Sequence, residues 1–118
     1  SVWPDFSKIP MANSKEMCVV YEEIEIGKEY KISNIETIKP IKADHTVSTC
    51  GYIYRKNDTS IAFSSDTCTL KYLLDEVNKD KTIKSIVVEC SFPKDMEEIA
   101  KASKHLTTKT LFEELKML

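Results

Sequence analysis

The fold is organised around Ile61-Ala62-Phe63-Ser64-Ser65-Asp66-Thr67, a short apolar run of β-type residues that ends on a carboxylate. A helical pattern follows at residues 69–78, so the stretch predicts a strand, a turn and a helix. An acid at the carboxyl end of a buried strand, in the turn before a helix, is where α/β folds place their chemistry. Asp and Thr are also common N-cap residues. Capping of the helix by Asp66 is the interpretation that this stretch, taken alone, favours.

Outward from this stretch, the sequence predicts several antiparallel strands followed by a β-α-β-α-α tail. The expected strands cover 17–26, 29–32, 35–43, 49–55, 60–65 and 84–90. The expected helices cover 69–78, 95–103 and the residues after Thr107. Pro40 predicts that 35–43 is an edge strand, and the run Ile86-Val87-Val88 suits a strand covered on both faces. The fold class is therefore α+β, with a mixed, largely antiparallel sheet and about three helices.

Composition excludes several classes of protein. The chain has 118 residues, so one domain is expected. Its 42% hydrophobic and 31% charged residues argue against disorder. A net charge of −2 makes nucleic acid an improbable main partner, and no apolar run approaches the ~20 residues of a membrane span. The two glycines, Gly27 and Gly51, lie too far apart to form a phosphate-binding loop.

The four cysteines lack the C-x-x-C spacing of zinc knuckles and thioredoxin motifs. Cys18, Cys50 and Cys90 lie within or beside apolar runs, where free cysteine behaves as a small hydrophobe. This usage favours a reduced, cytoplasmic protein. Cys68 follows Asp66 closely and is a candidate for exposure near a site, although a packing role is favoured over a nucleophilic one.

The two histidines, His45 and His105, and the acid Asp66 all fall at or just beyond the ends of predicted elements. A single histidine on a helix face is usually a core or surface residue. Two histidines and an acid in loops at element ends are more suggestive, because imidazole and carboxylate are ligands for zinc, manganese and iron. Three protein ligands would form a catalytic type of site with open coordination positions.

Five segments resemble the metallo-β-lactamase superfamily, and more narrowly its class II cyclic-nucleotide phosphodiesterases. They are Asp44-His45-Thr46-Val47-Ser48-Thr49-Cys50-Gly51-Tyr52, Phe63-Ser64-Ser65-Asp66-Thr67, Glu89-Cys90-Ser91-Phe92-Pro93, Ser103-Lys104-His105-Leu106-Thr107 and Trp3-Pro4-Asp5-Phe6. The spacing of the histidines and the acid is similar to that of the last three metal-ligand motifs of the superfamily's hydrolases. The resemblance covers nearly the whole chain.

The resemblance implies a role for each site residue. His45 would bind a first metal ion, Asp66 would bridge both ions at the catalytic centre, and His105 would bind the second ion. Glu89 and Ser91 would stand behind these ligands. The implied activity is two-metal hydrolysis of 3′,5′-cyclic nucleotides to 5′-nucleotides, with zinc as the first choice of metal and manganese or iron as alternatives.

The chain departs from the family in two places. Ser65 precedes Asp66 where the family usually has glycine, and the upstream His-x-His-x-Asp-His motif is absent. Residues 1–118 therefore resemble the C-terminal part of a single domain, half of an αββα sandwich. We expect pairing with the missing half, or self-association in its place, and negligible activity of the isolated chain. A chain that opens on Ser1 without methionine fits such a fragment.

Two other functions stay open. One is a nuclease of the tRNA-processing type, which shares the sandwich; basic patches would favour it, and the mild acidity of this chain does not. The other is a non-catalytic interaction domain that retains the fold, because a fold does not fix a function.

Overall fold

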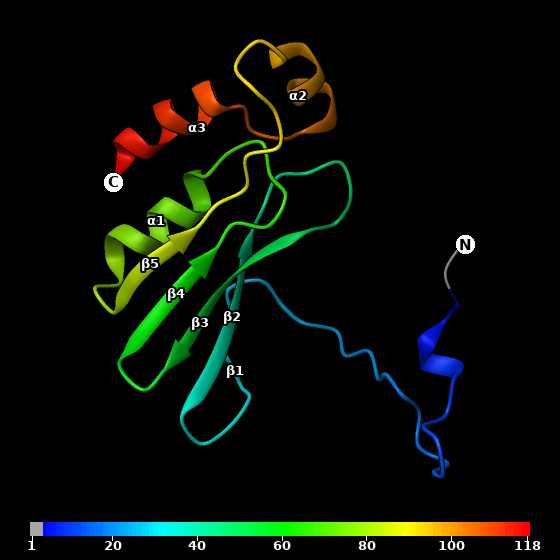
Figure 1. Ribbon diagram of the computed structural model, residues 1–118. Coiled ribbons are helices and arrows are strands. Elements are labelled where there is room, and N and C mark those ends of the chain that lie inside the picture. The colour runs from blue at the N-terminus through cyan, green and yellow to red at the C-terminus, as the bar shows by residue number, and fades with distance from the viewer. Residues whose placement is uncertain (1–3) are drawn as a thin grey trace.

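The computed structural model describes residues 4–118 and shows an α+β fold with one mixed five-stranded sheet and three α-helices (Figure 1). The strands lie in chain order; β1 to β4 pair antiparallel, and β5 pairs parallel with β4. The strands are β1 Tyr30–Lys31, β2 Glu36–Lys42, β3 Cys50–Lys56, β4 Thr59–Phe63 and β5 Ile83–Val87. The helices are α1 Lys71–Lys79, α2 Glu97–Ser103 and α3 Thr108–Glu114, with 3-10 turns at Phe6–Lys8 and Leu115–Met117.

The hydrophobic core lies between one face of the sheet and α1. Alternating residues of the strands and the apolar stripe of α1 are buried there, as expected for elements with one wet side. The buried members are Ile41, Ile53, Ala62, Leu70, Leu73, Leu74 and Leu106. The strands expected at 49–55 and 60–65 and the helix expected at 69–78 are confirmed, as β3, β4 and α1.

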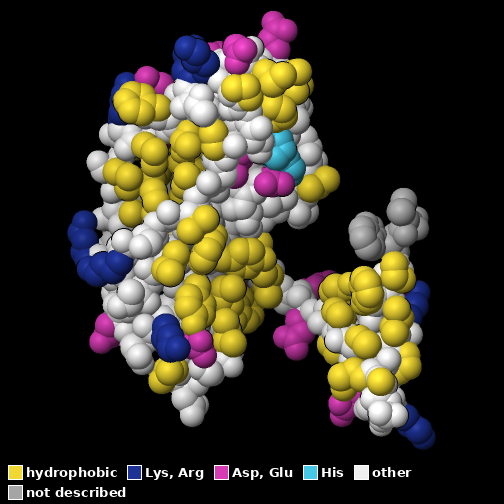
Figure 2. All heavy atoms as spheres, viewed as in Figure 1, with side chains coloured by type: hydrophobic (Ala, Val, Ile, Leu, Met, Phe, Trp, Pro, Cys, Tyr) yellow, Lys and Arg dark blue, Asp and Glu magenta, His cyan; other side chains and the backbone are white. Residues whose placement is uncertain are grey.

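The opposite face of the sheet is also apolar. Tyr52 pairs with Phe63, and Phe63 with Val87, so these three side chains point to that face. No helix among residues 4–118 covers them in Figure 1. Phe63 and Val87 remain 37% and 52% exposed. Figure 2 shows hydrophobic side chains gathered over the strands, so the sheet presents an uncovered apolar surface.

The predicted strand over 17–26 is wrong. These residues belong to an N-terminal arm, residues 4–26, which extends away from the sheet (Figure 1) and contains the 3-10 turn Phe6–Lys8 and an isolated bridge between Pro10 and Met17. Val20 and Tyr21 are 76% and 72% exposed. The alternating pattern is present, but no strand among residues 4–118 lies beside it to accept its hydrogen bonds. Of the aromatics in the quoted segment Trp3-Pro4-Asp5-Phe6, Phe6 is exposed and Trp3 lies outside the described residues.

The predicted edge position of 35–43 is also wrong, because β2 pairs with β1 as well as β3. Pro40 is tolerated because β1 is short. The two residues of β1 pair with Thr37 and Ile38, so the paired part of β1 does not reach Pro40. The carbonyl of Pro40 instead accepts a hydrogen bond from the Gly27 N–H at 2.8 Å. The missing N–H of proline therefore costs no bond of the sheet.

The strand that was expected to be covered on both faces is the edge strand β5. Its neighbour on one side is β4, and the exposure of Val87 shows that only one face is covered. The apolar residues of the helix expected over 95–103 are unequally buried, because Ala100 is buried whereas Met96 and Ile99 are exposed to solvent.

The cysteines depart in part from the expected packing role. All four are free; Cys18 and Cys90 are exposed, whereas Cys50 and Cys68 are half-buried.

Among residues 4–118, no helix has the length and apolar character needed to cross a membrane.

Glu114 caps α1 from a distance in the sequence. The N-cap position of α1, Leu70, provides no side-chain cap. One carboxylate oxygen of Glu114 instead accepts hydrogen bonds from the Leu70 N–H and, at 3.1 Å, from the Thr69 hydroxyl. A carboxylate is favourable there because the N-terminus of a helix carries partial positive charge.

We expect Glu114→Ala to lower the free energy of unfolding by about 1–2 kcal/mol, the usual cost of a lost helix cap. Glu113→Ala is the matched control. Glu113 forms only an exposed ion pair with Lys116, so its loss should change the free energy by less than about 0.5 kcal/mol. Urea unfolding followed by circular dichroism measures both, and equal effects would show that the cap contributes nothing specific.

Candidate metal centre

The site lies at one edge of the sheet, where the carboxyl ends of three strands meet. β4 and β5 run parallel, and β2 points the same way because two antiparallel pairings separate it from β4. The segment with Asp44 and His45 follows β2, Asp66 follows β4 and Glu89 follows β5. His105 reaches the same place from the connection between α2 and α3. The strand directions therefore bring together side chains that are far apart in the sequence.

The candidate ligands form one compact group. The ligand atoms of His45, Asp66 and His105 lie within 4.8 Å of one another, and His45 Nε2 is 4.0 Å from an Asp66 carboxylate oxygen. The two imidazoles are in edge contact, with ring centres 4.7 Å apart. Ligands of one tetrahedral zinc ion would stand about 3.4 Å apart. Side-chain movements of roughly an ångström would therefore bring the three ligand atoms to the spacing that one zinc ion requires.

Asp66 does not cap the helix. The N-cap position of α1 is Leu70, and the Asp66 side chain is 60% exposed beside a largely buried His45. Ser65 just before it has a φ of 54°, in the left-handed region that favours glycine. Ser65 is also the residue at which the chain departs from the glycine usual in the family that it resembles.

His105 is held from behind by Glu89 and Ser91. Its Nδ1 lies 3.1 Å from the Ser91 hydroxyl and 3.3 Å from a Glu89 carboxylate oxygen, and that hydroxyl donates to the other Glu89 oxygen at 2.9 Å. A carboxylate accepts hydrogen bonds, so Nδ1 carries the proton. The Nε2 lone pair is then left for a metal ion, which is the usual arrangement behind a metal-binding histidine.

His45 is held in the same tautomer by a different partner. Its Nδ1 lies 3.1 Å from the main-chain carbonyl of Lys104. A carbonyl can only accept, so this Nδ1 also carries the proton and Nε2 is again free. In its neutral form each imidazole therefore leaves the Nε2 lone pair for a metal ion, and the donor set fits a divalent ion of the zinc type.

Main-chain and hydroxyl contacts join the loops that carry the ligands. The Asp44 N–H donates to the buried Thr67 hydroxyl at 3.0 Å, and the Cys68 N–H donates to the Asp44 carbonyl at 2.9 Å. The Lys104 ammonium bonds the Asp44 carboxylate at 2.7 Å and lowers the pKa of Asp44. Burial, helped by Asp44, raises the pKa of the Cys68 thiol, which argues against Cys68 as a nucleophile.

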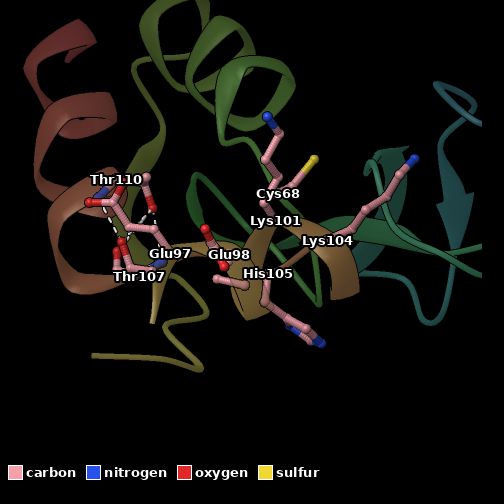
Figure 3. A pocket seen from close by; sticks show the side chains of 9 residues that line it. Cys68, Glu97, Glu98, Lys101, Lys104, His105, Thr107 and Thr110 are labelled. Atoms are coloured by element: carbon pink, nitrogen blue, oxygen red, sulfur yellow. Dashed lines mark hydrogen bonds between the residues drawn. The ribbon is translucent and has the colours of Figure 1, made fainter. Parts of the chain in front are cut away.

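Two hollows adjoin the group. A pocket of about 270 Å³ is lined by Asp66 and Glu89, and one of about 580 Å³ by Cys68, Ala100 and His105. Figure 3 shows that the imidazole of His105 points away from the end of the larger pocket, where Thr107 and Thr110 gather. The larger pocket therefore lies beside the candidate ligands and does not enclose them.

Sequence reasoning singled out the three candidate ligands, Glu89 and Ser91, and the structure brings all five to one edge. It missed Thr67 and Lys104. Thr67 was visible only as a possible cap, and its link to Asp44 spans distant parts of the chain. Lys104 gave no signal, because its contribution depends on a left-handed backbone and on contacts to the segment that follows β2, about 60 residues earlier in the chain.

A comparison with protein-family models finds no match for the chain, and a comparison with curated proteins finds no relative. The family resemblance therefore stands on the segments quoted above and is carried forward as a proposal.

Proposed function

We propose that this chain carries one part of a metal-dependent phosphodiesterase centre that hydrolyses 3′,5′-cyclic nucleotides to 5′-nucleotides. The observation that supports it is the approach of His45, Asp66 and His105 at the sheet edge, with the Nδ1 of both histidines engaged elsewhere. The resemblance to the class II cyclic-nucleotide phosphodiesterases of the metallo-β-lactamase superfamily supplies the substrate class.

His45 would hold one divalent ion and His105 the other, and Asp66 would reach both. Such ions, zinc first and manganese or iron as alternatives, polarise a phosphoryl oxygen and lower the pKa of a bound water. The protein groups orient the ligands: Glu89 and Ser91 fix the ring of His105, and Lys104 fixes the ring of His45. The 60% exposure of Asp66 leaves its carboxylate open to ions and substrate from the solvent side.

Further histidine ligands for a two-ion centre would come from outside residues 1–118, because His45 and His105 are the only two histidines in that sequence. The uncovered apolar sheet face supports a partner that presents a second apolar sheet, the other half of an αββα sandwich. The isolated chain would then hydrolyse cyclic AMP negligibly. The four free cysteines support a cytoplasmic setting for this proposal.

The experiment measures, by titration calorimetry, the zinc affinity of the purified wild-type chain and of four variants. We expect wild type to bind zinc, and His45→Ala, His105→Ala and Asp66→Asn each to lose at least about tenfold in affinity. Asp58→Asn is the matched control, since Asp58 is an exposed carboxylate in the β3–β4 turn. Wild type without zinc affinity, or the same affinity in all the variants, would exclude the centre.

A non-catalytic interaction domain is the second candidate, and the uncovered apolar face favours it independently of any metal. Light scattering over a range of concentrations separates the possibilities for that face. Reversible dimers would indicate that the apolar face mediates self-association. A monomer at all concentrations would exclude self-association, and pairing with the other half of the sandwich would be the possibility that remains. The nuclease alternative has no supporting observation, because the net charge is −2.

A further inference from the structure

We propose that Lys104 is a positioning residue that sets the distance and orientation between the two imidazoles, through its main-chain carbonyl and its ammonium at once. The inference rests on the proposed metal centre for its functional meaning. Its geometry stands on contacts that exist without a metal ion.

The main chain of Lys104 is in the left-handed conformation, with φ 55° and ψ 53°. This conformation ends α2. The Lys104 N–H donates to main-chain carbonyls of the last turn of the helix, and the His105 N–H donates to the Ala100 carbonyl at 2.9 Å. The Lys104 carbonyl then points away from the helix and accepts from His45 Nδ1. One peptide group therefore joins the backbone of one candidate ligand to the ring of the other.

The side chain of Lys104 makes a second contact with the same segment. Its ammonium lies 2.7 Å from a carboxylate oxygen of Asp44, the residue before His45. Lys104 therefore contacts the His45 segment twice, through its carbonyl and through its ammonium, and it is also the residue directly before His105 in the chain. This arrangement fixes His45 relative to His105, whose ring centres lie 4.7 Å apart.

The ion pair has a positioning role more than a stabilising one. The side chains of Lys104 and Asp44 are 43% and 42% exposed, and ion pairs of that exposure add little to folding stability. Groups that orient a metal-binding histidine change metal affinity by about 10–100-fold. Loss of the ammonium should therefore weaken zinc binding while the thermal midpoint stays near that of wild type.

The variants separate the ammonium from the backbone. Lys104→Met removes the charge at similar length and keeps the same backbone cost, and Lys104→Arg restores the charge. We expect Lys104→Met to lose about tenfold in zinc affinity, and Lys104→Arg to recover most of it. Asp44→Asn should resemble Lys104→Met, and the double variant should lose no more than either single variant, because both remove one interaction.

A second readout needs no metal. The ¹⁵N spectrum of the imidazoles above neutral pH reports the tautomer, and we expect wild-type His45 to carry its proton on Nδ1. In Lys104→Met the looser segment should shift His45 toward the Nε2–H form that free imidazole side chains prefer, and Lys104→Arg should reverse the shift. A spectrum of Lys104→Met that matches wild type overturns the proposal.

The two readouts distinguish this inference from the proposed function. If wild type binds no zinc, the proposed function fails, and the imidazole spectrum alone decides the role of Lys104. If wild type binds zinc, a changed spectrum with unchanged zinc affinity in Lys104→Met also overturns the positioning role.

Discussion

Glu89→Ala is expected to lower the free energy of unfolding by about 3 kcal/mol, because the substitution leaves buried polar groups without partners. One oxygen of Glu89 accepts from the Leu106 N–H at 2.8 Å and from the Thr67 N–H at 3.4 Å. Leu106 and Thr67 are 0% and 2% exposed. The same carboxylate therefore fastens the end of β5 to the loop before α1 and to the loop that carries His105.

Urea unfolding of Glu89→Ala, Glu89→Gln and Glu97→Ala measures this effect. Glu89→Gln keeps the size and one acceptor oxygen, so we expect a smaller loss, near 1 kcal/mol. Glu97 forms an exposed pair with Lys109 and should change the free energy by less than about 0.5 kcal/mol. Zinc affinity should fall with Glu89→Ala as well, since His105 loses the group behind it. A midpoint equal to that of wild type would contradict the buried role of this carboxylate.

Gly51→Ala is the second large effect, with an expected loss of about 2–3 kcal/mol from overpacking. A Cβ atom on Gly51 would stand 2.6 Å from the Phe63 carbonyl oxygen, 2.9 Å from the Ser64 carbonyl oxygen and 3.1 Å from Ile41. The first two are main-chain atoms, so no side-chain rotation relieves the clash. The end of β4 must move, and Asp66 follows that strand by three residues.

The control for this prediction is Gly27→Ala, at the other glycine. A Cβ there meets nothing within 4 Å, but the φ of 85° strains any L-residue, at a cost of about 1–2 kcal/mol. We therefore expect both variants to be less stable in urea, but only Gly51→Ala to weaken zinc binding. Unchanged zinc affinity in Gly51→Ala would show that the end of β4 adapts without moving Asp66.

Local patterns predicted the part of the fold in which sequence neighbours pack together. The apolar run 60–65, its hairpin partner and the helix after it follow from residue periodicity alone, and the structure contains all three. Residues 17–26 carry an equally good alternating pattern, yet they form no strand. A strand requires a neighbour to accept its hydrogen bonds, and periodicity within one segment says nothing about such a neighbour.

The residues of the candidate site also fall into those that the sequence could predict and those that it could not. Imidazole and carboxylate at element ends are visible in a sequence, so His45, Asp66 and His105 could be singled out. The carbonyl of Lys104 is not visible, because every residue has one and only the backbone conformation decides where it points. Gly51 was visible as a rare glycine, but its close contact with the end of β4 depends on the register between two strands.

The wide separation of the candidate ligands along the chain makes their cluster a reporter of the folding reaction. His45, Asp66 and His105 approach one another only when β2, β4 and the α2–α3 connection are all in place, so a chain with any one of these detached has no cluster. Contacts between distant segments form late, because closing long loops costs entropy before any contact repays it. The mutual ring contact of the two imidazoles should therefore appear in step with the last phase of refolding, and their proton resonances would time that phase without an added probe.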